Sequence, residues 1–183
     1  MPSNRLAPQI SVISTLTIAI LLLIGFALRI HAPDHMPAFI DEHRHMTRGR
    51  AVLNLTQNPV EFSHGKLLLY PYMAFFAPDN TPAGLVTARI AVALTGLFAA
   101  SASAAAARRL FGIQAGVFAA GVYALAPHAV FYERLALADP LAAGLAALAA
   151  WRVIPLAKNP TVRGGIITGL IIAAASLAKL TST

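Results

Sequence analysis

The chain has 183 residues, of which 57% are hydrophobic and only 11% are charged, and its mean hydropathy is +0.68. These values lie outside the range of soluble globular domains and are typical of an integral membrane protein. The sequence contains no cysteine, which excludes a disulfide framework, a thiolate nucleophile and a cysteine-based metal site. The net charge is +7, but the basic residues are scattered at the ends of apolar segments, so nucleic acid is not a predicted partner.

The first apolar segment, residues 10–28, contains no charged residue and has the length of about 20 residues that one bilayer crossing needs. We therefore predict a first transmembrane helix here. A cleaved signal peptide is the alternative, because Arg5 precedes the segment and Ala32 follows it. Against that alternative, the apolar segment is longer than a typical signal core, and Arg29 interrupts the cleavage site.

The longest polar interval, residues 30–65, has a dense group of charges at its centre. Residues 39–51 contain two adjacent carboxylates, two histidines and three arginines. Aspartate is a favoured N-cap residue, so we predict a helix that starts at Asp41 and ends at Asn58-Pro59. Its mixed polar and apolar composition predicts that this helix lies along the membrane surface.

Residues 66–77 are apolar but too short to cross a bilayer, and we expect Pro71 to divide them. They are predicted to form an interfacial or re-entrant element, with Tyr70 and Tyr72 at the depth of the lipid headgroups.

Four further apolar segments are predicted to cross the membrane. They are residues 85–107, 113–131, 139–152 and 164–180. The third of these four opens with Asp139-Pro140, the residue types preferred at N-cap and first helical positions. The predicted fold class is therefore all-α, a polytopic transmembrane helix bundle of about five crossings. It forms a single membrane domain over residues 1–183, with interfacial helices in an extracytoplasmic loop at 30–84.

Small residues are abundant in these crossings and are predicted to let the helices approach one another closely. They are Ala99 to Ala107, Gly112 with Gly116, Ala142 to Ala150, and Gly165 with Gly169.

Counting crossings places the polar loops at 30–84 and 133–139 on the same face of the membrane. The charged residues that share this face are Asp41, Glu42, Lys66, Arg134 and Asp139. A carboxylate there can accept a proton from a hydroxyl, while lysine and arginine stabilise charge on a departing phosphate. This combination suits a reaction between a lipid-linked phosphate and a second substrate.

The order of short motifs along the chain resembles that of a known family. The motifs are Asp41-Glu42, His64-Gly65-Lys66-Leu67-Leu68-Leu69-Tyr70, Ala88-Arg89-Ile90, Arg109-Leu110-Phe111-Gly112, Glu133 to Pro140, Gly169-Leu170, and Leu177-Ala178-Lys179-Leu180-Thr181. This order resembles the N-terminal part of the GT-C membrane glycosyltransferases, with protein O-mannosyltransferases and lipid A aminoarabinose transferases as the nearest branch.

The resemblance implies a transferase that uses a polyprenyl-phosphate sugar as donor. It implies that Asp41 is the catalytic carboxylate, with Glu42 beside it and Asp139 assisting. It also implies that Lys66 and Arg134 hold the donor phosphate, and it places Tyr70 among the substrate-binding residues. The family commonly has paired prolines after the lysine, where this chain has Leu67-Leu68.

Several alternatives stay open at this point. Asp41 and Asp139 could serve only as helix caps, and Lys66 could meet anionic headgroups. Asp41, His43 and His45 could hold a divalent metal. Positions 43 and 45 fall on different faces of a helix, so we assign no residue as a metal ligand. Family members continue beyond the fifth helix, so a shortened, non-catalytic relative that acts as a subunit of a larger membrane complex is the alternative function.

The expected location is the plasma (inner) membrane, with the Asp41 loop on the extracytoplasmic side. The count of basic residues on the two faces is nearly balanced, so it specifies this orientation weakly. The predicted partners are the polyprenyl-phosphate donor, membrane lipids and other membrane subunits.

Overall fold

The computed structural model describes residues 6–58, 66–77 and 79–179, and these residues contain helices and loops but no strand. The helices are α1 (Leu6–Ile30), α2 (Ile40–Leu53), α3 (Leu69–Phe76), α4 (Pro82–Phe111), α5 (Ile113–Leu125), α6 (Pro127–Tyr132), α7 (Asp139–Lys158) and α8 (Val162–Ala178). The predicted all-α fold class is confirmed.

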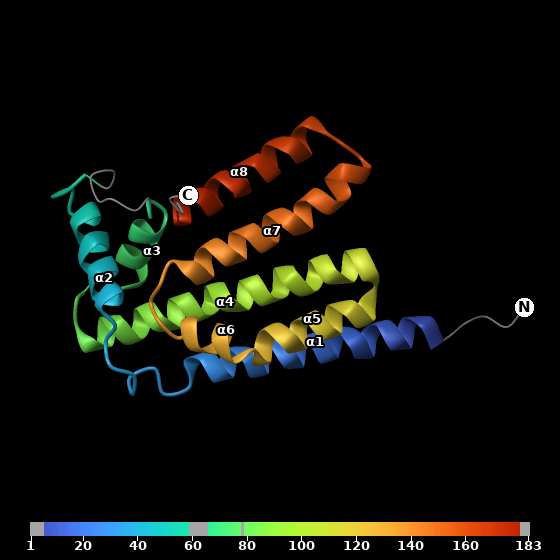
Figure 1. The fold of residues 1–183 in the computed structure, drawn as a ribbon, viewed down its shortest axis with the longest axis horizontal. Coiled ribbons are helices and arrows are strands. Elements are labelled where there is room, and N and C mark those ends of the chain that lie inside the picture. The colour runs from blue at the N-terminus through green and yellow to red at the C-terminus, as the bar shows by residue number, and fades with distance from the viewer. Residues whose placement is uncertain (1–5, 59–65, 78, 180–183) are drawn as a thin grey trace, which may run out of the picture.

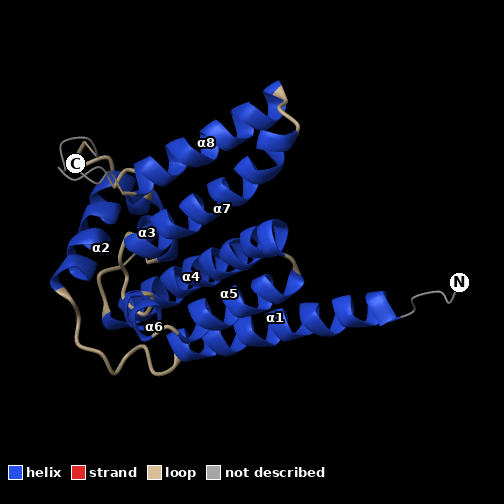
Figure 2. Ribbon diagram, turned by 45° about the vertical axis from the view of Figure 1, so that its right-hand side comes forward, coloured by secondary structure: helices blue, strands red, loops and turns tan. Residues whose placement is uncertain are grey.

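The long helices lie side by side, and successive ones run in opposite directions (Figure 1). Helix α4 packs against α1, α5 and α7, and α8 packs on α7. The short helices α2 and α3 lie together at one end of this bundle, where α4 and α7 begin and α8 ends (Figures 1 and 2). We call this the loop end, and the opposite end, with the turns at 112 and 159–161, the turn end.

Among the described residues, three helices are long and apolar enough to cross a membrane: α1 over Val12–Ile30, α4 and α7. These helices indicate a membrane protein with three candidate crossings. Helices α5 and α8 are apolar but shorter, with 13 and 17 residues. The predicted total of five crossings depends on these two helices and stays a prediction.

The helix α2 differs from its prediction at both ends. It begins one residue before Asp41, with Phe39 as the N-cap residue, and the Glu42 carboxylate accepts a hydrogen bond from the Phe39 N–H at 2.8 Å. Asp41 therefore lies in the first turn and is not the cap. The helix ends at Leu53 rather than at 58, because Leu55 adopts a positive φ of 55°, which helical backbone does not allow.

Pro71 does not divide the segment at 66–77, contrary to our expectation. It is the third residue of α3, where a backbone N–H has no partner within the helix, so proline costs no hydrogen bond. The Tyr70 side chain is fully buried within the protein, and the predicted headgroup depth of Tyr70 and Tyr72 stays a prediction. Tyr72 donates a hydrogen bond to the Ala91 carbonyl of α4 at 2.6 Å, and so ties α3 to the bundle.

The predicted segment 113–131 is broken into α5 and α6. Ala126 leaves the helical region, with φ −59° and ψ 117°, because the following Pro127 disfavours helical backbone before it. At the other end of α5, Gly112 has φ 92° and separates α4 from α5, as the predicted break requires.

Small residues form the contacts around α4, as predicted. A Cβ added to Gly144 of α7 would lie 2.8 Å from a Phe98 ring carbon of α4, and one added to Gly116 of α5 would lie 3.2 Å from the Ala104 carbonyl oxygen. The helices therefore pack at distances that a larger residue would prevent. The prediction fails for Gly165 and Gly169, which have no described atom within 4 Å of an added Cβ.

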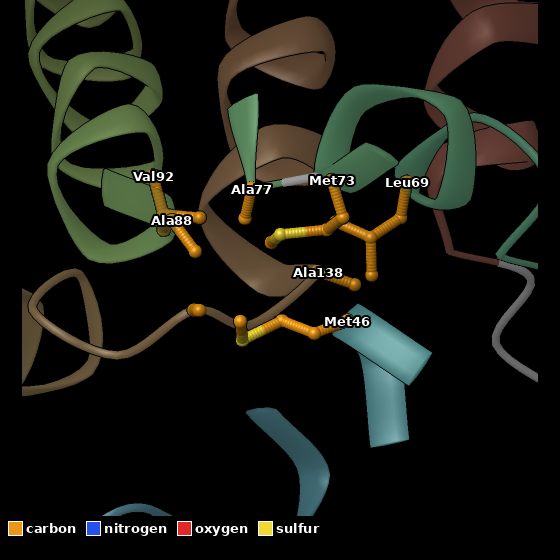
Figure 3. Packing of buried hydrophobic residues seen from close by; sticks show 8 residues of the cluster. Met46, Leu69, Met73, Ala77, Ala88, Val92 and Ala138 are labelled. Carbon is orange, nitrogen blue, oxygen red and sulfur yellow. The ribbon is translucent and has the colours of Figure 1, made fainter. Parts of the chain in front are cut away.

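A hydrophobic cluster joins α2 and α3 to the bundle (Figure 3). Its buried members are Met46, Leu69, Met73, Ala77, Ala88, Val92, Ala136 and Ala138. They come from α2, α3, the start of α4 and the segment before α7. The cluster fixes the position of the loop end, which carries the predicted site residues.

Candidate functional site

A cavity of about 570 Å³ opens at the loop end, between α2, α6 and the start of α7. Its charged and titratable lining residues include Asp41, His45, Lys66, Glu133, Asp139 and Lys179, and its aromatic wall is formed by Phe39, Tyr123, His128 and Tyr132. Three of the six predicted site residues therefore line one cavity: Asp41, Lys66 and Asp139. They come from segments far apart in the sequence, and helix packing brings them together.

Lys66 is held by a buried histidine of α2. Its ammonium nitrogen lies 2.8 Å from His45 Nε2, and His45 Nδ1 lies 3.1 Å from the Ala136 carbonyl oxygen. A carbonyl only accepts hydrogen bonds, so Nδ1 carries the proton and Nε2 accepts from Lys66. The imidazole is neutral, and it orients the lysine at the edge of the cavity.

The charges around this pair favour a neutral histidine. Burial lowers the pKa of His45 below its ordinary value, and the Lys66 ammonium lowers it further, against the opposing effects of the Ala136 carbonyl and Asp41. Burial also lowers the pKa of Lys66, which Asp41 and Asp139 counteract. An anionic ligand beside Lys66 would stabilise its charged form in the same way as these carboxylates do.

Asp139 does not act as a helix cap. The helix α7 begins at Asp139 itself, and its carboxylate pairs with the ammonium of Lys179 at 2.5 Å. Lys179 follows the last residue of α8, and the Leu68 N–H donates to the Leu177 carbonyl at 2.9 Å, which holds the end of α8 beside Lys66. The ammonium groups of Lys66 and Lys179 therefore line this cavity together with three carboxylates.

The Asp41 carboxylate is 42% exposed and lies on the cavity. Its one ion pair among the described residues is with Arg44, at 3.5 Å and also exposed. Such a pair contributes little and leaves the carboxylate accessible to a ligand.

Glu42, by contrast, is fully buried and does not line the cavity. Its two oxygens accept hydrogen bonds from Arg89 Nε and Nη2 at 2.8 and 2.7 Å, and from the Ala136 and Phe39 N–H groups. Burial alone would raise the pKa of Glu42, but these hydrogen bonds and the Arg89 charge lower it overall. Glu42 therefore stabilises the loop end through its bonds to Arg89, Ala136 and Phe39, and it is not placed to contact a substrate in the cavity.

Arg89 extends this network to the loop that follows α1. Its Nη1 and Nη2 groups donate to the carbonyls of Pro33, Met36 and Pro37. One arginine of α4 thus holds this loop, and through Glu42 it also holds the first turn of α2. This network sets where Asp41 points.

Glu133 lies at the back of the cavity in a second buried ion pair. Its carboxylate lies 2.5 Å from Arg29 Nε and accepts a hydrogen bond from the Tyr123 hydroxyl at 2.7 Å. Arg29 also donates to the carbonyls of Gly25, Ala124 and Tyr123. This pair joins α1, α5 and the end of α6, so its role in the described residues is to hold helices together.

Arg134 and Tyr70 lie away from the cavity. Arg134 donates to the His31 and Ala32 carbonyls, and Tyr70 lies beneath α2, where its hydroxyl accepts from Arg48 at 3.4 Å. The structure therefore does not bring these two predicted residues together with Asp41 and Lys66.

Lys179 and His45, which contact Asp139 and Lys66, are among the cavity residues that the predicted site did not include. Lys179 lies in the last motif of the family order, and His45 shares a helix face with Asp41, so signals for both were present in the sequence. Among the described residues, no group of three or more histidine, aspartate or glutamate side chains is placed to hold a metal ion. His64 lies outside the described residues.

Comparison of the chain with protein-family models, with curated proteins and with solved structures finds no match. The resemblance to the GT-C glycosyltransferases therefore remains a prediction that depends on motif order.

Proposed function

We propose that the chain is a membrane glycosyltransferase of the GT-C kind, or its N-terminal part, and transfers a sugar from a polyprenyl-phosphate donor. The observation that supports this most is the convergence of Asp41, Lys66 and Asp139 on one cavity at the end of an apolar helix bundle. At that place a donor could keep its isoprenoid chain in lipid and its phosphate and sugar in the cavity.

In this proposal, Lys66 and Lys179 bind the donor phosphate. Phosphate offers only acceptor oxygens, and both ammonium groups line the cavity. The Lys179 ammonium is paired with Asp139 in the free protein, so a phosphate would compete with that carboxylate. Arg134 and Tyr70 receive no role, and Glu42 supports α2.

Asp41 acts as the general base. The acceptor oxygen bonds to the anomeric carbon of the sugar, the bond from that carbon to the phosphate oxygen breaks, and its electron pair leaves with the phosphate. The acceptor proton passes to Asp41. The aromatic wall of Phe39, Tyr123 and Tyr132 offers surfaces on which a sugar ring can stack.

The orientation proposed is that the loop end is extracytoplasmic. Every aspartate and glutamate that the structure describes lies at the loop end, while the described charged side chains at the turn end are all basic: Arg108, Arg109, Arg152, Lys158 and Arg163. An excess of unpaired basic residues favours the cytoplasmic side.

The proposal predicts separate losses for two variants of the purified full chain. Lys66→Met should weaken binding of undecaprenyl phosphate about tenfold or more, because a charge-assisted hydrogen bond is lost. Asp41→Asn should retain this binding and lower sugar transfer from a panel of radiolabelled polyprenyl-phosphate hexoses at least about 100-fold.

Matched controls are Lys158→Met, at the turn end, and Asp34→Asn, an exposed carboxylate that does not line the cavity. Undiminished transfer by Asp41→Asn would refute its assignment as base. Unchanged phosphate binding by Lys66→Met would refute the donor site.

A second candidate function is a non-catalytic subunit of a larger membrane complex. The outer face of α8 supports it, because Ile166 and Leu170 are exposed and Gly165 and Gly169 leave room for close approach of another helix. Co-purification of a second membrane protein that a Gly169→Leu substitution removes would support this candidate, and a chain that stays monomeric in mild detergent would argue against it.

A further inference from the structure

The turn end of the bundle carries positive charge without nearby carboxylates. The seven acidic residues of the sequence lie at positions 34, 41, 42, 61, 79, 133 and 139, and none occurs within 80–132 or 140–183. The basic residues at the ends of α4 and α7 and at the start of α8 are therefore not neutralised locally. This excess charge favours an anionic ligand.

A second cavity lies at this end, between the last turns of α7 and the first turn of α8. It has a volume of about 200 Å³ and is lined by Arg152, Pro155, Leu156, Asn159, Thr161 and Gly164. We call it the headgroup pocket. Pro155 and Leu156 supply an apolar side, while Arg152 and Asn159 supply hydrogen-bond donors. Its size suits a small polar group rather than a whole sugar.

The flanks of the headgroup pocket are apolar and exposed. Val153 of α7 and Val162 and Ile166 of α8 are exposed apolar side chains on the two helices that form the pocket. Helix α7 is also a candidate membrane crossing. A ligand with an anionic head and apolar chains would match both the pocket and these flanks.

Arg152 brings to the headgroup pocket a hydrogen-bond donor that has no acceptor among the described residues. Its Nε atom is shielded from solvent and has no hydrogen-bond partner among the described residues. At the loop end, by contrast, Arg29 and Arg89 each donate to a carboxylate and to several carbonyls. Arg134 at that end also has a shielded Nε atom without a partner in the described part of the chain, but its Nη2 group donates to the His31 and Ala32 carbonyls. A shielded donor without an acceptor costs free energy, which a bound anion would recover.

We propose that the headgroup pocket binds the phosphate of an anionic phospholipid, with Arg152 as its main contact. Guanidinium groups bind phosphate oxygens through paired N–H donors, and basic pockets between membrane helices on the cytoplasmic side are suited to anionic headgroups. The site is distinct from the cavity at the loop end and does not depend on the proposed transferase activity.

The position of the single tryptophan makes the site measurable. Trp151 precedes Arg152 and is the only tryptophan in the sequence. The full chain is reconstituted in phosphatidylcholine vesicles that contain increasing fractions of phosphatidylglycerol with brominated acyl chains, which quench a nearby tryptophan. The same titration with brominated phosphatidylcholine measures quenching by a lipid without net charge. For each lipid we determine the fraction at which half of the Trp151 fluorescence is quenched, and the ratio of these two fractions measures selectivity for the anionic headgroup.

We expect phosphatidylglycerol selectivity in the unmodified chain. Arg152→Gln should lower it about tenfold or more, because hydrogen bonds to a charged phosphate are lost. The matched control Arg108→Gln removes an exposed charge at the same end and should lower it about fivefold at most. Far-UV circular dichroism checks that each variant is folded. If Arg152→Gln does not fold, Arg152→Lys against Arg108→Lys carries the test, with the larger loss again expected at 152.

Three results would overturn the proposal. The first is equal quenching by the two brominated lipids in the unmodified chain. The second is an equal loss of selectivity at positions 108 and 152, which would mean that diffuse charge rather than a pocket binds the lipid. The third is removal of the selectivity by sodium phosphate but not by sodium chloride at the same ionic strength, which would assign the site to free phosphate.

Discussion

Two adjacent carboxylates at the start of α2 have opposite environments. Successive residues of a helix point about 100° apart, so when one side chain faces the bundle its neighbour faces elsewhere. Glu42 is fully buried against Arg89, whereas Asp41 is exposed on the cavity. The buried residue therefore supports the position of the accessible one.

The buried pair predicts how acid affects stability. Because the folded pKa of Glu42 is lowered, its contribution is fully present above its ordinary value of 4.5 and is lost as the pH falls through the lower folded value. Glu42→Ala should lower the free energy of unfolding at pH 7 by about 3–5 kcal/mol, because Arg89 keeps a buried charge without its carboxylate. Thermal unfolding in detergent, followed by the fluorescence of Trp151, measures this.

The control for this prediction is Asp34→Asn, which alters an exposed carboxylate and should change stability by less than about 0.5 kcal/mol. Glu42→Gln should also show a weaker dependence of stability on pH below 4.5 than the unmodified chain. An identical pH profile for the two proteins would contradict the supporting role of Glu42.

At the scale of the helix, proline positions explain two features of the bundle. Pro71 lies in the first turn of α3 and removes no hydrogen bond, whereas Pro155 lies inside α7 and leaves the Trp151 carbonyl without its helical donor. Arg109 of α4 donates to that carbonyl at 3.1 Å, and its guanidinium carbon lies 4.3 Å from the centre of the Trp151 ring. An inter-helix contact therefore replaces a bond within the helix.

This replacement predicts a specific coupling between two positions. Arg109→Gln should destabilise the chain by about 1–2 kcal/mol, from the lost hydrogen bond and the lost cation–π contact. In a Pro155→Ala background, the introduced alanine offers the N–H that the Trp151 carbonyl lacks, so the same substitution should cost about 1 kcal/mol less. A double-mutant cycle of thermal unfolding measures the difference, and strictly additive effects would contradict the replacement.

At the scale of the whole molecule, the alternating helix directions separate two ends of different charge. The loop end combines carboxylates with basic residues in ion pairs, and the turn end is basic alone. Each end has its own cavity, and we propose phosphate chemistry for both. The ends differ in charge balance, because carboxylates pair with Arg29, Arg89 and Lys179 at the loop end, whereas the described residues of the turn end include no carboxylate.

The number of crossings can be tested directly, because the sequence has no cysteine. Single cysteines at Gly112 and Asn159 should react with a membrane-impermeant maleimide only after the cells are permeabilised. Cysteines at Asp34, Asp79 and Phe131 should react in intact cells or spheroplasts. This pattern requires that α5 crosses the membrane in addition to α4 and α7. Labelling of Gly112 and Phe131 from the same side would reduce the number of crossings.

The sequence by itself determined the helical class, the approximate limits of the long helices and the gathering of Asp41, Lys66 and Asp139 at one end. These properties depend on hydropathy, on segment length and on the parity of the helices, all of which are local or additive along the chain. The prediction from sequence was wrong where a helix end depends on one backbone angle, as at Leu55. It was also wrong where the effect of a proline depends on its position in the helix, as at Pro71.

Only the tertiary structure decided which charged residues face the cavity. Glu42 carries the same charge as its neighbour Asp41, but its partner Arg89 is supplied by α4. Arg134 carries the same charge as Lys66 and lies close to Asp139 in sequence, but its acceptor is supplied by the loop after α1. Such partners lie 47 and 103 residues away in the chain, so no local pattern shows them. His45 and Lys179 joined the site for the same reason, because helix packing rather than sequence spacing placed them beside Lys66 and Asp139.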